Sequence, residues 1–152
     1  MGISSFGAQG TEGGNRGDST YNSTLNLPLT SIASGGKTTI LNAIGYTTSD
    51  GVHHIQSATC IECGLRIGRT ALAGSTASNK IIVLLSDGIA NKVWTGDSSY
   101  TNPNISSKQA AINEANKGRS ENGIIYYSVG FGQRGTDQIH EPTLVSIAGD
   151  AL

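Results

Sequence analysis

Charged residues are scarce in this sequence, in which Asp, Glu, Lys and Arg make up only 14% of 152 residues. Ten basic residues nearly balance eleven acidic ones, and no basic cluster stands out. Nucleic acids and anionic membranes are bound through such clusters, so we expect neither as a partner. Apolar runs long enough to cross a bilayer are also missing, and we expect no membrane span in this chain. The residues after Met1 lack the basic and apolar regions of an export signal, which we expect outside this chain if the protein is secreted.

Glycine and small polar residues are abundant instead. There are 21 glycines, many Ser, Thr and Asn residues, and 36% hydrophobic residues. This composition predicts a single folded domain over residues 1–152, with a hydroxyl-rich surface of low charge. Two glycosylation sequons, at 22–24 and 104–106, agree with an extracellular or cell-surface location.

Apolar periodicity predicts alternating strands and helices. Expected strands are Ile3 to Phe6, Thr24 to Leu29 (an edge strand), Lys80 to Ser86 and Gly123 to Val129. Expected helices are Thr38 to Thr47, Thr59 to Leu72, Ser107 to Lys117 and most of Ile139 to Ala148. The third and fourth strands are uniformly apolar, which is typical of parallel strands covered on both faces. The pattern predicts an α/β domain with a mainly parallel sheet.

The only cysteines, Cys60 and Cys63, form a C-x-x-C pair at the start of an expected helix. A redox-active pair usually follows a buried strand, whereas a polar loop precedes this one. A zinc site would have to recruit His53 and His54, and no second C-x-x-C exists. We therefore favour a structural disulfide or two buried thiols.

Two glycine-rich stretches resemble nucleotide-binding loops. SGGKTTILNAI ends like a phosphate loop, but Ser31 occupies the place of its first glycine and no buried strand precedes it. We expect Thr38 or Thr39 to cap this helix and Lys37 to face solvent. GFGQRG at 130–135 fits the dinucleotide fingerprint without the second strand that the fingerprint needs. A nucleotide-binding enzyme or switch is the alternative function that these stretches leave open.

Thr59 and Asp87 form a more coherent pair. Asp87 directly follows the apolar run KIIVLLS, at the carboxyl end of a predicted parallel strand, where α/β folds bind ligands. Thr59 stands where a loop enters a helix. Simpler roles are a T-x-x-E capping box for Thr59 and an Asp-Gly turn for Asp87. Together, their oxygens are hard ligands of the kind that Mg²⁺ prefers.

The order of these segments resembles the von Willebrand factor type A domain, from that family's second strand almost to its end. GISSFG and LPLTS resemble its second and third strands, and GKTTILNAI and ATCIECGL resemble a helix and the threonine loop of its metal site. KIIVLLSDGIAN and GIIYYSVGFG are similar to its fourth and fifth strands, and EPTLVSIAGDAL to the segment that follows. The resemblance implies a doubly wound, mainly parallel sheet with helices on both faces, which is incomplete in this chain.

The family's metal-ion-dependent adhesion site implies roles for two residues. Thr59 would be a direct ligand of Mg²⁺, Mn²⁺ or Ca²⁺, and Asp87 a ligand acting through water. The family's D-x-S-x-S segment and its last strand are absent from this sequence, so we expect a fragment. We expect this chain alone to bind metal weakly or not at all, whereas the parent domain binds it.

The resemblance implies a non-enzymatic adhesion module of a surface or secreted protein. A carboxylate of a protein ligand would complete the coordination of the metal, and Trp94 and Tyr100 would lie on the rim of the site. A structural type A domain of a pilus or envelope assembly, with a degenerate metal site, is a further alternative. A catalytic role finds no support, because His53, His54 and His140 have no recognisable nucleophile partner.

Overall fold

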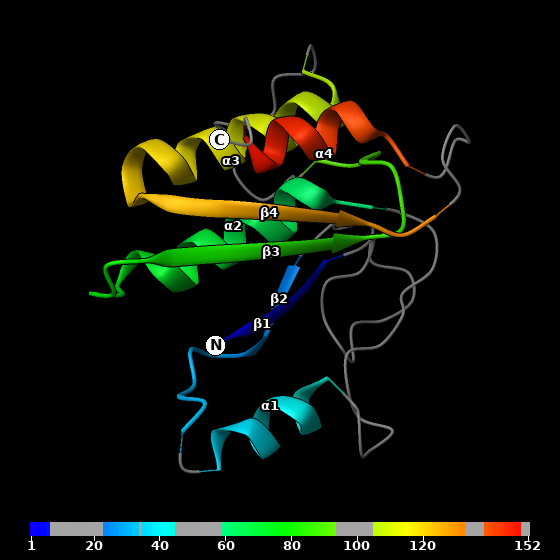
Figure 1. Cartoon of the computed structure of the whole chain (residues 1–152). Helices are drawn as coiled ribbons and strands as arrows, with labels where there is room; N and C mark the ends of the chain where they lie inside the picture. Colours follow the sequence, from blue (N-terminus) through cyan, green and yellow to red (C-terminus); the bar gives the residue numbers. More distant parts are fainter. Residues whose placement is uncertain (7–22, 34, 45–58, 94–104, 133–138, 150–152) are drawn as a thin grey trace.

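The computed structural model describes residues 1–6, 23–33, 35–44, 59–93, 105–132 and 139–149. These residues form a mixed α/β structure with helices, one parallel strand pair and one antiparallel pair (Figure 1). Its strands are β1 (Ile3–Phe6), β2 (Ser23–Leu27), β3 (Lys80–Ser86) and β4 (Ile124–Gly130). Its helices are α1 (Gly36–Ala43), α2 (Ile61–Ala73), α3 (Ser107–Asn122) and α4 (Glu141–Ala148).

The parallel pair joins β3 and β4, with α3 in the connection between them. Their register runs from Lys80 opposite Ile124 to Ser86 opposite Gly130. The predicted bounds of β3 are confirmed, and those of β4 differ by one residue at each end. A continuous run of β-branched and aromatic residues suits a strand, which explains the accuracy. Both strands end at the same edge, so the residue after β3 lies at the carboxyl edge of this pair.

The antiparallel pair joins β1 and β2. Two hydrogen bonds between Met1 and Thr30 extend the pair at one end. The Met1 amino group donates to the Thr30 carbonyl at 2.6 Å, and the Thr30 N–H donates to the Met1 carbonyl at 2.8 Å. The expected edge character of β2 agrees with this arrangement, since among the described residues β2 pairs only with β1. Helix α1 contacts β2 and lies apart from the other helices (Figure 1).

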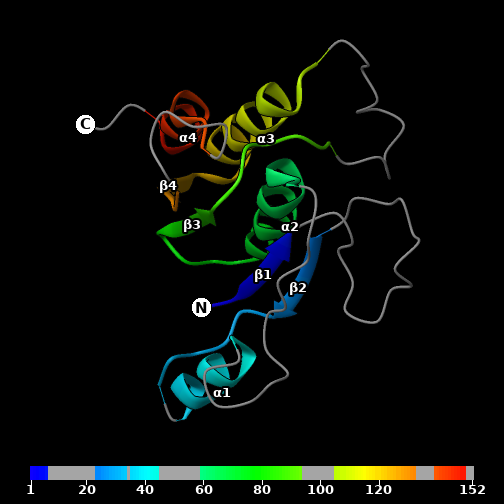
Figure 2. The same ribbon diagram turned by 90° about the vertical axis from the view of Figure 1, so that its right-hand side faces the viewer.

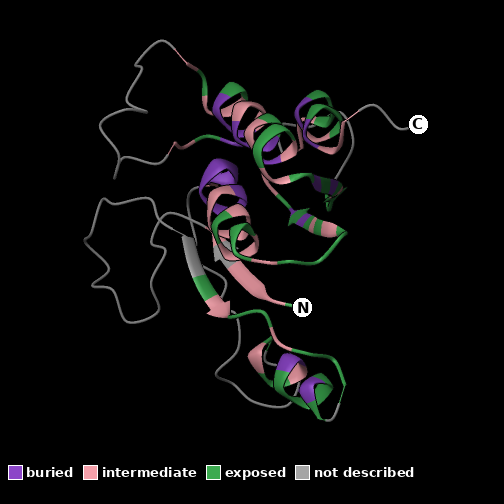
Figure 3. Ribbon diagram, turned by 90° about the vertical axis from the view of Figure 1, so that its left-hand side faces the viewer, coloured by how far each residue is buried: buried purple, intermediate pink, exposed green. Residues whose placement is uncertain are grey.

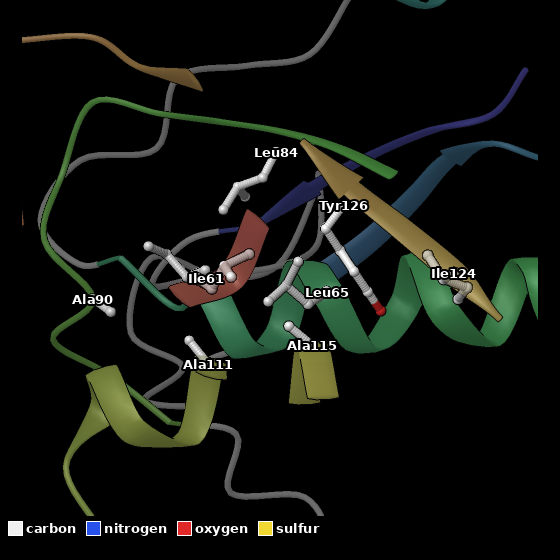
Figure 4. Close-up of a cluster of buried hydrophobic side chains, with 9 residues drawn as sticks. Ile61, Leu65, Leu84, Ala90, Ala111, Ala115, Ile124 and Tyr126 are labelled. Carbon is white, nitrogen blue, oxygen red and sulfur yellow. The ribbon is translucent and has the colours of Figure 1, made fainter. Parts of the chain in front are cut away.

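Helix α2 lies against both strand pairs and carries much of the core. Figure 2 shows β1 between β2 and β3, with α2 beside both β1 and β3. Side chains of α2, α3, β3, β4 and α4 meet in one apolar cluster, most of it labelled in Figure 4. The buried members are Ile61, Leu65, Leu84, Ala90, Ala111, Ala115, Ile124, Tyr126 and Ile147. The small residues Ala111 and Ala115 allow α3 to pack closely in this cluster.

The prediction that β3 and β4 are buried on both faces is wrong for the described residues. Ile81, Val83 and Leu85 are 49–58% exposed, whereas Leu84 on the opposite face is buried. On β4, Ile125 and its neighbours Tyr127 and Val129 are likewise exposed, and Figure 3 shows the alternation along the strands. The physical reason is that α2, α3 and α4 all lie on one side of this strand pair (Figures 1 and 2).

Two predicted helix starts also need correction. Neither Thr38 nor Thr39 caps α1, because its N-cap is Gly35 in the left-handed region, with φ 87° and no side-chain cap. A left-handed backbone at this position favours glycine, which the sequence supplies. Helix α2 begins at Ile61 with Cys60 as its N-cap, two residues later than predicted. Thr59 therefore does not form the capping box, and its hydroxyl is left for another contact.

A buried ion pair ties α2 to α3. Arg69 Nε lies 2.5 Å from Glu114 Oε1, and the Glu114 side chain is fully buried. Burial lowers the pKa of Arg69, but the hydrogen bond and charge of Glu114 outweigh this effect, so its pKa is raised. Breaking a pair of this kind leaves a charge without its partner in a largely buried interface. The pair therefore fixes how the two helices face each other.

Candidate functional site

The structure brings Thr59 against the turn that follows β3. A β-carbon on Gly88 would stand 2.5 Å from Thr59 Oγ1, so a larger residue there would require Thr59 or the turn to move. Gly88 directly follows Asp87, which is exposed at the carboxyl edge of the parallel pair. The predicted pair of oxygen-bearing residues thus lies at one edge, with the Thr59 hydroxyl next to the backbone of the Asp-Gly turn.

Backbone hydrogen bonds hold Thr59 in this place. Its N–H donates to Asn91 Oδ1 at 2.8 Å, and its carbonyl accepts from the N–H groups of Asn91 (3.1 Å) and Lys92 (3.3 Å). Asn91 therefore contacts Thr59 through both its side chain and its backbone. This double contact fixes the residue that precedes α2 to the segment that follows β3.

Ser86 shapes the turn that presents Asp87. The Ser86 hydroxyl is buried, donates to the Gly88 carbonyl at 3.1 Å, and accepts from the Gly88 N–H at 3.3 Å. This local bonding is typical of a serine that starts a turn. It leaves the carboxylate of Asp87 on the solvent side of the edge.

Ser86 and Asn91 are the site residues that the sequence interpretation missed. A signal for Ser86 was present, because Ser-Asp-Gly after a strand is a turn sequence. No local pattern marks Asn91, since its partner Thr59 is distant in the sequence and belongs to another element.

This edge offers fewer side-chain oxygens than a metal ion usually has as ligands. Among the described residues, no group of three or more His, Cys, Asp or Glu side chains is arranged to hold one. Glu62, at the start of α2, is buried and bonds to Arg66 at 2.8 Å, so its carboxylate is already used within the helix. Ser86 Oγ and Asn91 Oδ1 are engaged in hydrogen bonds within the chain, so among the described residues the Thr59 hydroxyl and the Asp87 carboxylate are the side-chain oxygens that we consider for a metal ion.

Cys60 and Cys63 are joined by a disulfide at the start of α2. Both sulfurs belong to fully buried residues, and Cys60 Sγ also accepts the Cys63 N–H at 3.3 Å as the helix cap. Burial removes the access that thiol exchange requires. The disulfide stands directly after Thr59 and constrains the backbone that carries its hydroxyl.

Other sequence candidates have structural roles or lie outside the described residues. The rim residues Trp94 and Tyr100 and the histidines at 53 and 54 lie outside the described ranges. His140 is the N-cap of α4. Its Nδ1 accepts a hydrogen bond from the Thr143 N–H at 3.3 Å and is hydrogen-bonded to the Thr143 hydroxyl at 2.8 Å. Both hydrogen bonds involve Nδ1, so this ring nitrogen has a structural role in capping the helix.

The stretch that resembles a phosphate loop enters α1 through a closely packed backbone. The α-carbon of Gly36 is packed against the Ser31 carbonyl so closely that no β-carbon could be accommodated. Lys37 is exposed, as expected. Of the fingerprint at 130–135, residues 133–135 lie outside the described part of the chain.

Comparison with known protein families, with curated proteins and with solved structures finds no match to this chain. Within the described ranges, no helix is both long and apolar enough to cross a membrane.

Proposed function

We propose that this chain is the greater part of a protein-binding module of the type A class, which binds ligands at the edge carrying Thr59 and Asp87. The observation that supports this most strongly is the contact between the Thr59 hydroxyl and Gly88, beside Asp87. Two segments that are distant in the sequence are thereby fixed at the carboxyl edge of a parallel strand pair, a common position for ligand sites in α/β folds.

The proposed architecture is a doubly wound, mainly parallel sheet with helices on both faces. The parallel pair of β3 and β4, connected through α3, supports this architecture. The exposed apolar residues on the other face of the pair support it as well, since a second helical layer would cover them.

A divalent cation fits this edge only in part. It would contribute positive charge that attracts a ligand carboxylate, and Thr59 and Asp87 would hold it through hard oxygens. Six oxygen ligands are usual for Mg²⁺, of which these two residues supply a minority. We therefore propose that this chain alone binds Mg²⁺, Mn²⁺ or Ca²⁺ weakly, and that the module acts in adhesion without catalysing a reaction.

The proposed location is the cell surface or the extracellular space. The Cys60–Cys63 disulfide supports this location, because disulfides persist in oxidising compartments and are rare in the cytosol.

Paramagnetic Mn²⁺ provides a test that works for weak binding. Titrated into the ¹⁵N-labelled chain, it should broaden the amide signals of Thr59, Asp87 and Gly88 before others. Asp87→Asn should remove this selectivity, whereas Glu121→Gln, at an exposed acidic residue of α3, should leave it unchanged. Broadening that centres on other carboxylates, or that persists in Asp87→Asn, would refute the proposed site.

Two further measurements separate the alternatives. Calorimetry with Mg²⁺ should show no micromolar affinity, and such an affinity would contradict the weak binding proposed for this chain. A thermal-shift comparison with ATP and NAD should show no stabilisation, and a rise in Tm with either nucleotide would favour a nucleotide-binding enzyme or switch.

A further inference from the structure

Two buried oxygen atoms, where α2, α3 and β4 meet, have no hydrogen-bond partner among the described residues. They are Oε2 of Glu114, on α3, and the hydroxyl oxygen of Tyr126, on β4. Glu114 is fully buried and Tyr126 is 2% exposed. A buried polar group without a partner is costly, and in folded proteins such groups are usually bonded to the protein or to an ordered water molecule.

The two oxygens are neighbours in the core. Gly118 lies one helical turn after Glu114 on α3, and a β-carbon on Gly118 would overlap the Tyr126 hydroxyl. Figure 4 shows the Tyr126 side chain reaching from β4 toward α2, with its oxygen at the far end. Burial raises the pKa of Tyr126, and the negative charge of Glu114 raises it further. The carboxylate is therefore near enough to act on the hydroxyl, although no hydrogen bond joins them.

The charges around these oxygens decide what can join them. The other oxygen of Glu114, Oε1, is bonded to Arg69 Nε at 2.5 Å, so the formal charges of this pair cancel. The guanidinium of Arg119 lies over the Tyr126 ring, 5.3 Å from its centroid, and adds positive charge. A cation would add to this excess, and an anion would be repelled by the carboxylate. An uncharged molecule that both donates and accepts hydrogen bonds suits the two oxygens.

A route for such a molecule adjoins the tyrosine. Tyr126 lines a pocket of about 560 Å³ between α3, β4 and α4, together with the polar side chains of Asn116, Arg119 and Ser146. Because Tyr126 is almost fully buried, the pocket meets little of its surface. This favours an occupant as small as water.

We propose that one water molecule is bound between Glu114 and Tyr126 as part of the fold. The water donates a hydrogen bond to Glu114 Oε2 and accepts one from the Tyr126 hydroxyl. Buried waters form about two to four hydrogen bonds to polar groups that otherwise lack a partner, and these groups supply two. The water thereby connects β4 to the ion pair of α2 and α3. This inference goes beyond the proposed metal site and does not rest on it.

The Tyr126 hydroxyl should affect how long the water stays more than how stable the fold is. In the unfolded chain this hydroxyl is also hydrogen-bonded to water, so its bond to the internal water changes the free energy of unfolding little. In the core, each hydrogen bond must break before the water can leave. Loss of one bond should therefore shorten the residence of the water about tenfold or more.

A crystal structure of the unaltered chain, at a resolution that shows ordered waters, provides the direct test. We expect one water whose oxygen lies about 2.5–3.0 Å from both Glu114 Oε2 and the Tyr126 hydroxyl oxygen. A direct hydrogen bond between the two side chains, or a site without water between them, would overturn the proposal.

Magnetic relaxation dispersion of oxygen-17 tests the same site in solution, because it detects waters that stay bound much longer than those at the surface. Tyr126→Phe should shorten the residence of one such water about tenfold or more. Tyr127→Phe is the matched control, since it removes a hydroxyl from an exposed tyrosine on the opposite face of β4, and it should leave the dispersion unchanged. Equal dispersions for the two variants would contradict the proposed water.

A third variant removes the carboxylate. The double variant Arg69→Met, Glu114→Leu takes away both charges, and the water should be lost from its crystal structure because its stronger acceptor is missing. A folded double variant that keeps the water would also overturn the proposal. Should circular dichroism show that this variant does not fold, the two tyrosine variants decide the question.

Discussion

Thr59, just before α2, lies so close to Gly88, just after β3, that a β-carbon on Gly88 would stand 2.5 Å from the Thr59 hydroxyl oxygen. The contact joins the two segments that form the candidate site. It is also a place where one methyl group should have a measurable effect.

Gly88→Ala should destabilise the fold by about 1–3 kcal/mol, because the methyl group forces Thr59 or the turn to move. Gly74→Ala is a matched control, since no atom lies within 4 Å of a β-carbon there and the backbone is in the right-handed helical region. It should change the free energy of unfolding by less than about 0.5 kcal/mol. Urea unfolding measures both, and equal midpoints for the two variants would contradict the close contact.

Glu114→Gln should be the more severe change, with a loss of about 3–5 kcal/mol, because it leaves Arg69 charged beside a neutral group in the α2–α3 interface. Glu121→Gln, on the exposed side of the same helix, should cost less than about 0.5 kcal/mol. The double variant Arg69→Met, Glu114→Leu should lose less stability than Glu114→Gln alone, since no buried charge remains. A double variant that is less stable than the single one would show that the pair itself contributes net stability.

Tyr126 should make stability depend on pH in the alkaline range. Burial, followed by the negative charge of Glu114, raises the pKa of Tyr126 to about 12. An unfolded tyrosine has a pKa of about 10, so between these values the folded state holds more protons than the unfolded state. The tyrosine's contribution is therefore complete below pH 10 and is lost as the pH rises toward 12.

Comparison with Tyr126→Phe isolates this effect, because phenylalanine does not ionise. Among the described residues the Tyr126 hydroxyl finds no hydrogen-bond partner, so the substitution should cost little at neutral pH. From pH 9 to pH 12 the unaltered chain should lose about 2 kcal/mol relative to the variant, as measured by urea unfolding at each pH. A constant difference across this range would mean that Tyr126 ionises equally in both states.

The Cys60–Cys63 disulfide should resist reduction while the chain is folded, since both cysteines are fully buried. Mass spectrometry after treatment with dithiothreitol and iodoacetamide should show no alkylation without urea and two alkylated cysteines with it. The double variant Cys60→Ser, Cys63→Ser should lose about 2 kcal/mol from loop entropy, a small amount because the loop is short. Rapid alkylation of the folded chain would indicate an accessible, exchange-competent disulfide.

The strand positions could be predicted well because β3 and β4 are continuous apolar runs with clear polar boundaries. The same apolar runs led to the wrong prediction that both faces of these strands are buried. Apolar side chains such as Val83 allow a layer of helices to cover that face of the strand. Whether helices do cover it depends on where distant segments of the chain pack, and Val83 is exposed in the structure. The packing of distant helices is a feature of tertiary structure, and the spacing of apolar residues along one strand does not report it.

The site could be predicted in part. Asp87 follows directly from its place after a strand, and Thr59 from its place before a helix. Local capping rules favoured Thr59 as a helix cap, yet the structure gives that role to Cys60, whose sulfur is linked to Cys63. The contact with Gly88 and the bonds to Asn91 depend on how α2 packs beside β3, which single-sequence patterns do not report.

The sequence of β3 has a further consequence for the behaviour of the chain in concentrated solution. IIVLLS is a six-residue segment without charge, proline or glycine. It has one exposed apolar face and, among the residues that the structure describes, one edge without a strand partner. Segments of this composition stack readily into cross-β fibrils. The charges that flank it directly are Lys80 on one side and Asp87 on the other. We therefore expect fibril formation to start at β3, where the backbone N–H and C=O groups of its free edge and the side chains of its exposed face are both accessible.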